Sequence, residues 1–468
     1  MREKHEYQLH DTVKKAHQTH RDFHQNQKDL LQGFKNMQQS FSKVFDPFGL
    51  MSPIHDMQQE ALDTYQAGIG TYDRLVKDYD KPEFDLNETK IDGKSVKVTE
   101  EKAISSDFYD LIRFKRDTDR NDPKLLIVSP MSGHFATLLR DTVETLLPDH
   151  DVYMVDWKDA RDVPLDKGEF GLDTYIQSVM DCMKELGPDG HVMAVCQPTV
   201  AVLSAVSIMA ANDDPNQPQS MTLMAGPLDT RNSQTEVNKF ARSKSIDWFK
   251  DNLLARVPDS YEGAGRLVYP GYRQLTAFMA MNPDNHMKSF GKIFNALKDG
   301  DEKALKKFDD FYDEYFAVAD LDAKFYIETV EKVFKEHHLP NGKMTFNGQK
   351  VDPAKIGKTA LFTVEGGKDD ICEPGETIAV QDMCINIKSD RKFHYLQEGA
   401  GHYGVFSGSK FRENIAPRIT GFIRHIANMN GQKLAPSERA KLPQAHRPKP
   451  LDQGRKSGNL QKKKSFKP

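Results

Sequence analysis

The alternation of short apolar runs with longer helical stretches limits most strongly what this chain can fold into. Six runs of five or six residues, rich in large apolar or β-branched side chains, recur along it. They are 124–129, 151–155, 191–195, 220–224, 360–364 and 392–396. Strands that alternate with helices favour a parallel sheet that helices cover on both faces. We therefore expect an α/β core in two parts, 96–234 and 351–430.

One segment of this core has the length and apolar character of a membrane span. Residues 192–211 are almost continuously apolar over about 20 positions. Gln197 and Pro198 interrupt the run, and Ser204 and Ser207 follow them. We therefore expect a buried strand, a turn and a buried helix here, with no transmembrane segment.

Two regions outside the core have a helical pattern. Apolar residues recur at spacings of three and four over 9–44, which predicts a long amphipathic helix within an N-terminal helical region, 1–95. A second helix is expected over about 55–79, after the Pro- and Gly-containing stretch at 45–53. Residues 235–350 are helical and rich in Phe and Tyr. We expect them to form a lid over an active site.

The apolar stripe of the first helix needs a covering surface. It can pack on the body of the protein, pair with a second copy of the chain, or lie on the surface of a particle. Its nearly heptad spacing favours packing against protein. His20 and His24 lie one turn apart on the same helix, but no carboxylate or thiol completes a metal site with them.

Composition excludes several broad classes of protein. The 65 basic and 69 acidic residues give a net charge of −4, which argues against a general nucleic-acid binder. The 4 Cys residues form no CxxC pair, so a reducing compartment fits better than a disulfide framework. No apolar segment follows the first basic residues, so we expect a cytoplasmic protein. Residues 431–468 are strongly basic and nearly free of large apolar side chains, which predicts a disordered tail.

Cys196 lies where a reactive side chain is often exposed. The strand over 191–195 ends just before it, and Pro198 suits the first turn of the helix that follows. A strand-to-helix elbow presents a nucleophile beside a helix N-terminus, and its usual form has small residues two positions to either side. Here those positions hold Ala194 and Pro198, so the motif is degenerate. A buried structural Cys is the alternative interpretation.

Two later loops supply partners for this thiol. Asp369 follows the strand over 360–364, and His402 follows the last strand in a Gly-rich loop. The chain order nucleophile, acid, histidine is that of the α/β-hydrolase fold. We therefore predict a catalytic triad of Cys196, Asp369 and His402, with Asp370 as a weaker candidate for the acid. In such a triad the carboxylate orients the imidazole, which activates the nucleophile.

An oxyanion intermediate needs hydrogen-bond donors. The backbone N–H of Gln197, at the start of the helix, is one candidate. The second is expected from Met131 or Ser132, in the loop after the strand over 124–129, where Gly133 lets the backbone approach closely. Ser132 is also the alternative nucleophile.

Several sequence motifs resemble those of the intracellular polyhydroxyalkanoate (polyhydroxybutyrate) depolymerases. They are LIRFKRD at 111–117, SPMSGHFATLLR at 129–140, VCQP at 195–198, VYPG at 268–271, FYDEY at 311–315 and GHYGVF at 401–406. The resemblance runs from about Phe45 to Met429. It implies an α/β-hydrolase with its nucleophile at Cys196, its acid at Asp369 and its histidine at His402. The stretch GGKDD at 366–370 departs from the family pattern without moving the acid.

The resemblance also implies a substrate and a location. The substrate would be the stored polyester of a cytoplasmic granule, cleaved through a thioester on Cys196 to give 3-hydroxybutyrate or oligomers. No cofactor is expected, although coenzyme A could replace water as the acyl acceptor. The alternatives are a polyester synthase, which usually has Gly on both flanks of its Cys, a non-catalytic granule protein of the same fold, and a general esterase or thioesterase. Polymer and a second copy of the chain are the expected partners.

Overall fold

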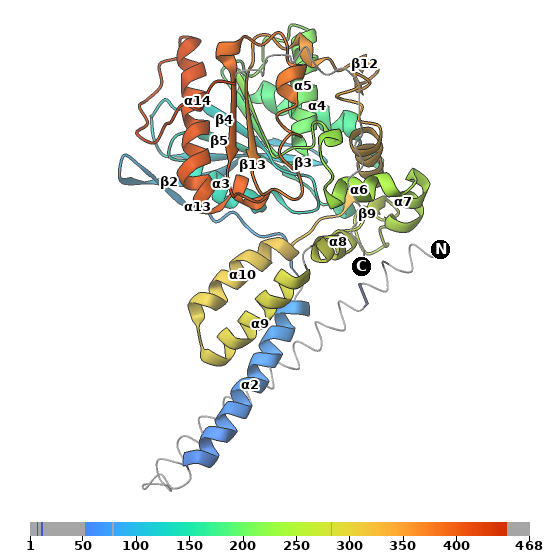
Figure 1. The fold of residues 1–468 in the computed structure, drawn as a ribbon, viewed down its shortest axis with the longest axis vertical. Coiled ribbons are helices and arrows are strands. Elements are labelled where there is room, and N and C mark those ends of the chain that lie inside the picture. Colours follow the sequence, from blue (N-terminus) through green and yellow to red (C-terminus); the bar gives the residue numbers. More distant parts are fainter. Residues whose placement is uncertain (1–6, 8–10, 13–51, 77–78, 282, 447–468) are drawn as a thin grey trace, which may run out of the picture.

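A nine-stranded sheet forms the centre of the computed structural model, which describes residues 7, 11–12, 52–76, 79–281 and 283–446 (Figure 1). In spatial order its strands are β1 (Glu88–Ile91), β2 (Lys94–Ser105), β3 (Tyr109–Arg116), β5 (Asp151–Trp157), β4 (Lys124–Val128), β6 (His191–Val195), β7 (Ser220–Met224), β13 (Ala360–Gly366) and β14 (Lys392–Gln397). The six predicted strands are β4, β5, β6, β7, β13 and β14. They pair in parallel. The strands β1, β2 and β3 extend the sheet in antiparallel pairing.

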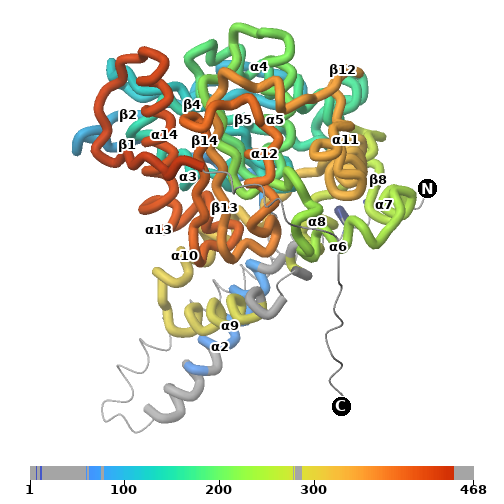
Figure 2. The backbone as a smooth tube through the Cα atoms, turned by 45° about the horizontal axis from the view of Figure 1, so that its top comes forward, coloured from blue at the N-terminus to red at the C-terminus, as the bar shows by residue number. Residues whose placement is uncertain are grey.

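Helices cover both faces of the sheet. They are α3 (Arg140–Leu146), α4 (Leu172–Leu186), α5 (Pro198–Ala211), α12 (Val380–Met383), α13 (Gly408–Lys410) and α14 (Ala416–Met429). In β4, Leu126 and Val128 pack in one core cluster with α4 and α5, whereas Leu125 and Ile127 pack in a second with α3 and α14. Successive side chains of a strand point to opposite faces, so each strand buried on both faces must be apolar throughout. Figure 2 shows these helices around the central strands.

The apolar run over 192–211 forms β6 and α5, as predicted. Both elements are buried in the body of the protein. Among the helices of the described residues, none is both long and apolar enough to cross a membrane.

The long insertion between β7 and β13 is mainly helical. Its helices are α6 (Glu236–Ser243), α7 (Ile246–Leu253), α8 (Gly271–Met281), α9 (Pro283–Asp299), α10 (Glu302–Phe316) and α11 (Ala323–Thr329). A π-helical segment (Val330–Lys335) follows α11 directly. It also contains short strands that sequence reasoning did not predict. They are β8 (Ala255–Arg256), β9 (Leu267–Tyr269) and β10 (Leu321–Asp322) in one small sheet, and the hairpin β11 (Thr345–Phe346) and β12 (Gln349–Lys350).

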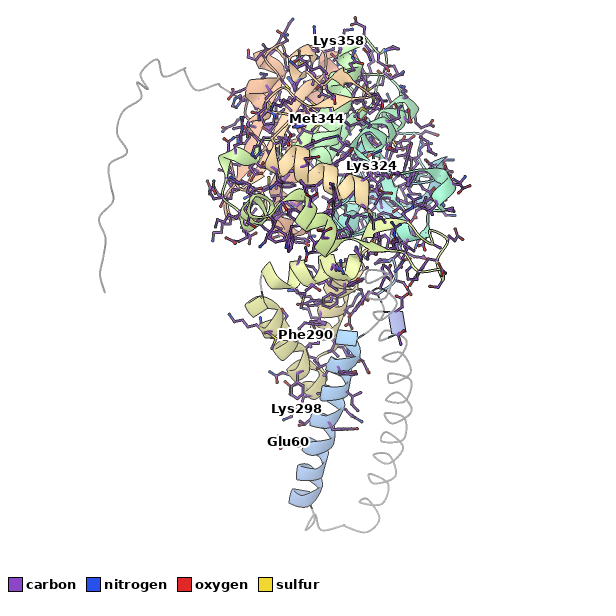
Figure 3. The ribbon with its side chains drawn as sticks, turned by 90° about the vertical axis from the view of Figure 1, so that its right-hand side faces the viewer. Glu60, Phe290, Lys298, Lys324, Met344 and Lys358 are labelled. Carbon is purple, nitrogen blue, oxygen red and sulfur yellow. The ribbon has the colours of Figure 1, made fainter. Side chains whose placement is uncertain are left out.

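An arm of three helices projects from the body (Figures 1 and 2). The predicted second helix is α2 (Ser52–Val76), which lies along α9 of the insertion and reaches α10 through Arg74. Arg74 of α2 pairs with Asp309 at 2.7 Å, and Glu60 pairs with Lys298 at 2.9 Å (Figure 3). The predicted first helix, over 9–44, falls almost entirely outside the described residues. Tyr7, just before that range, is buried against the body and donates to Asp320 at 2.6 Å.

The first part of the C-terminal segment is ordered, so the prediction of a disordered tail is wrong for residues 431–446. Arg439 pairs with Asp149 at 2.7 Å, Ala445 bridges to Phe393 beside the sheet, and the Lys441 N–H donates to the Pro417 carbonyl at 2.8 Å. This segment lacks apolar burial, and polar and backbone contacts fix it to the body instead. Residues 447–468 lie outside the described part of the chain.

Candidate active site

Cys196 occupies a strained elbow between β6 and α5. Its φ of 68° lies in the left-handed region that side chains other than glycine rarely adopt. Its N–H donates to the Met224 carbonyl at 2.8 Å, so the neighbouring strand β7 fixes the turn. Pro198 begins the helix directly afterwards, where no backbone donor is needed. Strain of this kind is common at functional sites and presents the side chain at the edge of the sheet.

Close packing next to the elbow explains how it forms without glycine on its flanks. Thr199 donates its hydroxyl to the Cys196 carbonyl at 2.8 Å, in the first turn of α5. Gly226 lies against this threonine: a Cβ on Gly226 would fall 1.9 Å from Thr199 Oγ1. Gly226, which follows β7 and lies 30 residues after Cys196 in the chain, thus allows the close backbone approach that an elbow requires.

His402 and Asp369, two of the candidate site residues, lie in contact. Nδ1 of His402 is 2.8 Å from Oδ2 of Asp369, and both side chains are almost fully buried. Oδ1 of the same carboxylate accepts hydrogen bonds from the N–H groups of Ile371 at 3.0 Å and Cys372 at 2.8 Å. Asp370 is exposed. Of the two candidate acids, Asp369 is therefore the one that contacts His402.

The charges around His402 favour its protonated form. Burial alone lowers the pKa of His402, but the charges of Cys196 and Asp369, together with hydrogen bonds to both, raise it well above its ordinary value. The same interactions place the imidazole between the thiol and the carboxylate. A protonated imidazole beside a cysteine stabilises the thiolate, which is the reactive form.

Two buried glutamates, which sequence reasoning missed, hold the loop that carries Asp369. Glu365, in β13, accepts hydrogen bonds on Oε1 from the N–H groups of Gly375, Thr377 and Ile378, each at 2.9 Å. Glu376 accepts from Asn238 of the insertion at 2.9 Å, and burial raises its pKa to about 7. The sequence signal available for Glu365 was a glutamate inside an otherwise apolar strand.

The candidate oxyanion donors lie at the same edge of the sheet. Gln197 caps α5 and its side-chain oxygen accepts from the buried Tyr175 hydroxyl at 3.1 Å. Met131 and Ser132 follow β4, the neighbour of β6. Gly133, with φ of 105°, turns this loop toward the insertion, where its carbonyl accepts from the Ala319 N–H at 2.6 Å.

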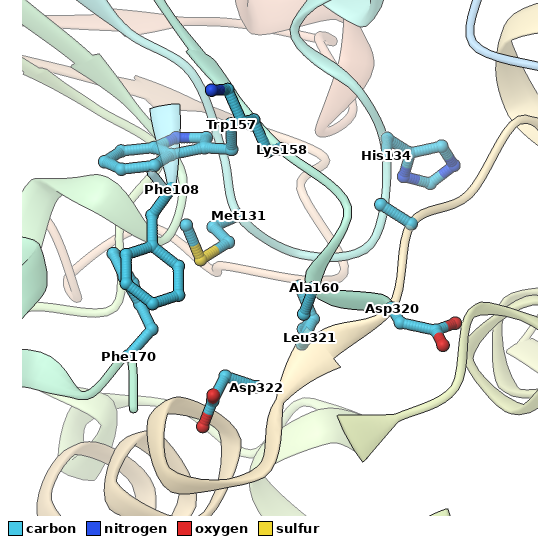
Figure 4. Close-up of a pocket in the computed structure, with 11 residues that line it drawn as sticks. Phe108, Met131, His134, Trp157, Lys158, Ala160, Phe170, Asp320, Leu321 and Asp322 are labelled. Carbon is cyan, nitrogen blue, oxygen red and sulfur yellow. The ribbon is translucent and has the colours of Figure 1, made fainter. Parts of the chain in front are cut away.

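A pocket opens beside this loop (Figure 4). We call it the aromatic pocket, and Phe108, Met131, His134, Trp157, Lys158, Ala160, Phe170, Ala319, Asp320, Leu321 and Asp322 line it. It lies beyond the carboxyl ends of β4 and β5, which is where ligands bind in open α/β sheets.

Comparison with known proteins gives a family and distant structural similarities. Residues 225–427 match the family model described as PHB de-polymerase C-terminus. The chain is similar to a membrane phospholipase A (13% identity, 86% of this chain and 99% of that one, TM-score 0.40). It is also similar to a 2-hydroxy-6-oxo-6-phenylhexa-2,4-dienoate hydrolase from Rhodococcus sp. strain RHA1 (11% identity, 70% and 99%, TM-score 0.41). A third similarity is to a thermophilic esterase from Thermogutta terrifontis (11%, 73% and 97%, TM-score 0.37). No curated protein matches the sequence.

The topology itself defines the class of the protein. A mainly parallel sheet, an elbow after β6, and Cys196, Asp369 and His402 in that chain order after three strands make this an α/β-hydrolase fold. Within that class, the match over 225–427 supports the resemblance seen in the sequence: this part of the chain matches the PHB depolymerase family model. Fold and family together support an ester hydrolase.

Proposed function

We propose that the protein is an intracellular poly(3-hydroxybutyrate) depolymerase that cleaves its polyester through an acyl thioester on Cys196. The observation that carries the proposal is the contact between His402 and Asp369 at 2.8 Å, together with the strained backbone of Cys196, in a chain of the PHB depolymerase family. A synthase is disfavoured because Ala194 and Pro198 stand where synthases usually have Gly.

The first half-reaction transfers an acyl group to the enzyme. The Cys196 thiolate attacks an ester carbonyl, and backbone N–H groups of Gln197 and of Met131 or Ser132 stabilise the oxyanion. The tetrahedral intermediate collapses with cleavage of the C–O bond, and the protonated His402 gives its proton to the departing alkoxide. The products are a hydroxyl-terminated chain and a thioester.

The second half-reaction returns the enzyme to its starting state. His402, now neutral, takes a proton from water, whose oxygen attacks the thioester carbonyl. The C–S bond breaks, and 3-hydroxybutyrate or a short oligomer leaves. Asp369 keeps the imidazole in the tautomer that both steps need. Coenzyme A is an alternative acceptor, because its thiol exchanges with a thioester at little cost in free energy.

The surroundings of the site suit a neutral, water-insoluble polymer. The insertion over 235–350 serves as the lid, and its arm has a core of aromatic residues that includes Phe290, Tyr312 and Phe316. Tyr315 of the same arm reaches Tyr403, beside the predicted histidine, with a ring separation of 6.5 Å. We place the working protein at the surface of polymer granules in the cytoplasm.

The experiment that tests this proposal uses amorphous granules as the substrate. The purified protein is incubated with them in the presence and absence of coenzyme A, and the soluble products are identified by mass spectrometry. Release of 3-hydroxybutyrate or its oligomers without coenzyme A supports hydrolysis, and release only as the coenzyme A thioester supports thiolysis. No product under either condition, from a folded protein, would contradict depolymerisation.

A further inference from the structure

The aromatic pocket shares Met131 with the predicted site of acyl transfer. Met131, from the loop expected to donate to the oxyanion, forms the middle of its lining (Figure 4). The loop follows β4, and β4 is the direct neighbour of β6, which carries Cys196 at its end. Carboxyl ends of parallel strands share one edge of a sheet, so the pocket and the thiol open at the same edge.

A second structural link joins the pocket to the elbow. Trp157, in the pocket wall, packs edge-on against Tyr175 with ring centroids 4.8 Å apart. The Tyr175 hydroxyl donates to the side chain of Gln197 at 3.1 Å, next to Cys196. Rigid aromatic packing therefore sets the position of the pocket wall relative to the residue that follows the nucleophile.

The wall of the pocket is aromatic and apolar. Phe108 packs on Phe170 at a centroid distance of 5.1 Å, and Phe170 packs on Trp157 at 5.7 Å. Met131 and Leu321 complete the apolar lining. In Figure 4 the three rings lie together on one side of the pocket, with Met131 facing them. Such a surface favours an alkyl group over a polar one.

The charged groups of the lining are already paired with other parts of the protein. Asp322 pairs with Arg266 at 2.8 Å, and Asp320 accepts from the buried Tyr7 at 2.6 Å. Lys158, at the rim, donates to the Ser106 carbonyl at 2.5 Å. Arg266 balances the charge of Asp322, and Asp110, 3.5 Å from Lys158, balances that of the lysine. Burial raises the pKa of Asp320 and so favours its neutral form. A ligand in this pocket is therefore expected to be neutral, since a charged one would have to break one of these pairs.

We propose that the aromatic pocket receives the alkyl side chain of the hydroxyacyl unit held at Cys196, and that Phe108, Trp157 and Phe170 limit the length of that side chain. The inference rests on the proposed ester hydrolysis and adds to it a preference for the length of the substrate's alkyl side chain. On this proposal we expect a methyl side chain to be accommodated between the rings and Met131, and longer chains to meet the aromatic wall.

Phe108 offers the clearest test, because it is partly exposed and its truncation costs less core packing than that of the buried Phe170. The substrates are soluble trimers of 3-hydroxybutyrate and of 3-hydroxyhexanoate, whose side chains are methyl and propyl. One methylene in an apolar pocket changes selectivity by about 10–200-fold. Phe108→Ala should therefore raise the kcat/KM ratio of propyl to methyl substrate about tenfold or more, and Phe108→Trp should lower it.

The control is Phe240→Ala, which removes the same atoms from an exposed position in the lid outside the pocket. It should leave the ratio unchanged. An unchanged ratio in both Phe108 variants, with normal turnover of the methyl trimer, would overturn the pocket assignment while leaving the proposed function standing. Failure of the unmodified protein to cleave either trimer, both with and without coenzyme A, would instead refute the proposed function, and the pocket assignment with it.

A binding measurement keeps the proposal testable if the Phe108 variants fold poorly. The chain has 2 Trp residues, Trp157 in the pocket and Trp248 in α7 of the lid. In the double variant Cys196→Ala, Trp248→Phe only the pocket tryptophan emits. The 3-hydroxybutyrate trimer should change this emission saturably, and the 3-hydroxyhexanoate trimer should bind about tenfold more weakly or worse. Equal affinity for the two trimers, or no change with either, would contradict the assignment.

Discussion

Nδ1 of His402 lies 2.8 Å from Oδ2 of Asp369, although 33 residues separate them in the chain. The contact forms because β13 and β14 are parallel neighbours, with Gly366 opposite Gln397. Each strand then ends in a loop at the same edge of the sheet, and one loop presents the carboxylate while the other presents the imidazole. The parallel register therefore creates the pair.

Replacing Asp369 should affect catalysis far more than replacing Asp370. Asp369→Asn keeps the shape of the side chain but favours the wrong imidazole tautomer, and we expect kcat to fall by a factor on the order of 10⁴, as for the equivalent change in a serine protease. Asp370 is exposed, and Asp370→Asn should leave kcat within about threefold of the unmodified protein. Turnover of a soluble 3-hydroxybutyrate oligomer measures both. Comparable losses in the two variants would contradict the assignment of the acid.

Gly226→Ala should destabilise the elbow. The added Cβ would lie 1.9 Å from Thr199 Oγ1, which itself bonds the Cys196 carbonyl, so the first turn of α5 must shift. We expect a loss of about 1–3 kcal/mol in the free energy of unfolding, with a lower kcat. Gly291→Ala is the matched control, because nothing lies within 4 Å of a Cβ there. Since α9 is helical at that position, the control should gain about 1 kcal/mol by urea unfolding.

Glu376 should make stability depend on pH. Its carboxyl is buried and its pKa is raised to about 7, above the unfolded value of 4.5. The folded state therefore holds a proton that the unfolded state loses, and the stabilisation is complete below pH 4.5 and lost as the pH rises to about 7. Relative to Glu376→Gln, the unmodified protein should lose about 3 kcal/mol of unfolding free energy over this range. Parallel stability curves for the two proteins would contradict the buried, protonated carboxyl.

The ordered part of the C-terminal segment should contribute to stability. A chain ending at residue 446 keeps the pair of Arg439 with Asp149 and the bridge of Ala445 to Phe393. A chain ending at residue 432 loses both, and we expect its melting temperature to be lower by a few degrees, about 2–4 °C for each kcal/mol lost. Equal melting temperatures for the two truncated chains would show that these contacts add nothing.

Sequence reasoning succeeded where the signal was local. Five of the six parallel strands are buried almost throughout and mainly apolar, and their runs were found because both of their faces are covered. The sixth, β14, lies at the edge and is only partly buried. The strand β2, which lies next to the edge strand β1, was not delimited, since its residues are mostly exposed and its sequence is polar. Cys196, Asp369 and His402 were proposed because each lies within five residues of the end of a strand.

Other features depend on partners that are distant in the chain. The hydrogen bond between Glu376 and Asn238 spans 138 residues, and the pair of Arg439 with Asp149 spans 290. No pattern around either residue indicates its partner. The same holds for Gly226, whose role at the elbow is visible only once β6 and β7 are neighbours. Long-range polar contacts and close approaches therefore set the limit of prediction from this sequence.

The most direct test of the account is to trap the acyl enzyme. The protein is mixed with a soluble 3-hydroxybutyrate oligomer, quenched with acid within the first turnover, and digested for peptide mass spectrometry. We predict a hydroxyacyl adduct on the peptide that contains Cys196, removable by hydroxylamine. It should be absent from Cys196→Ala protein and from unmodified protein whose thiol has first been blocked with iodoacetamide. An adduct on Ser132, or turnover that persists in Cys196→Ala protein, would contradict the thioester mechanism.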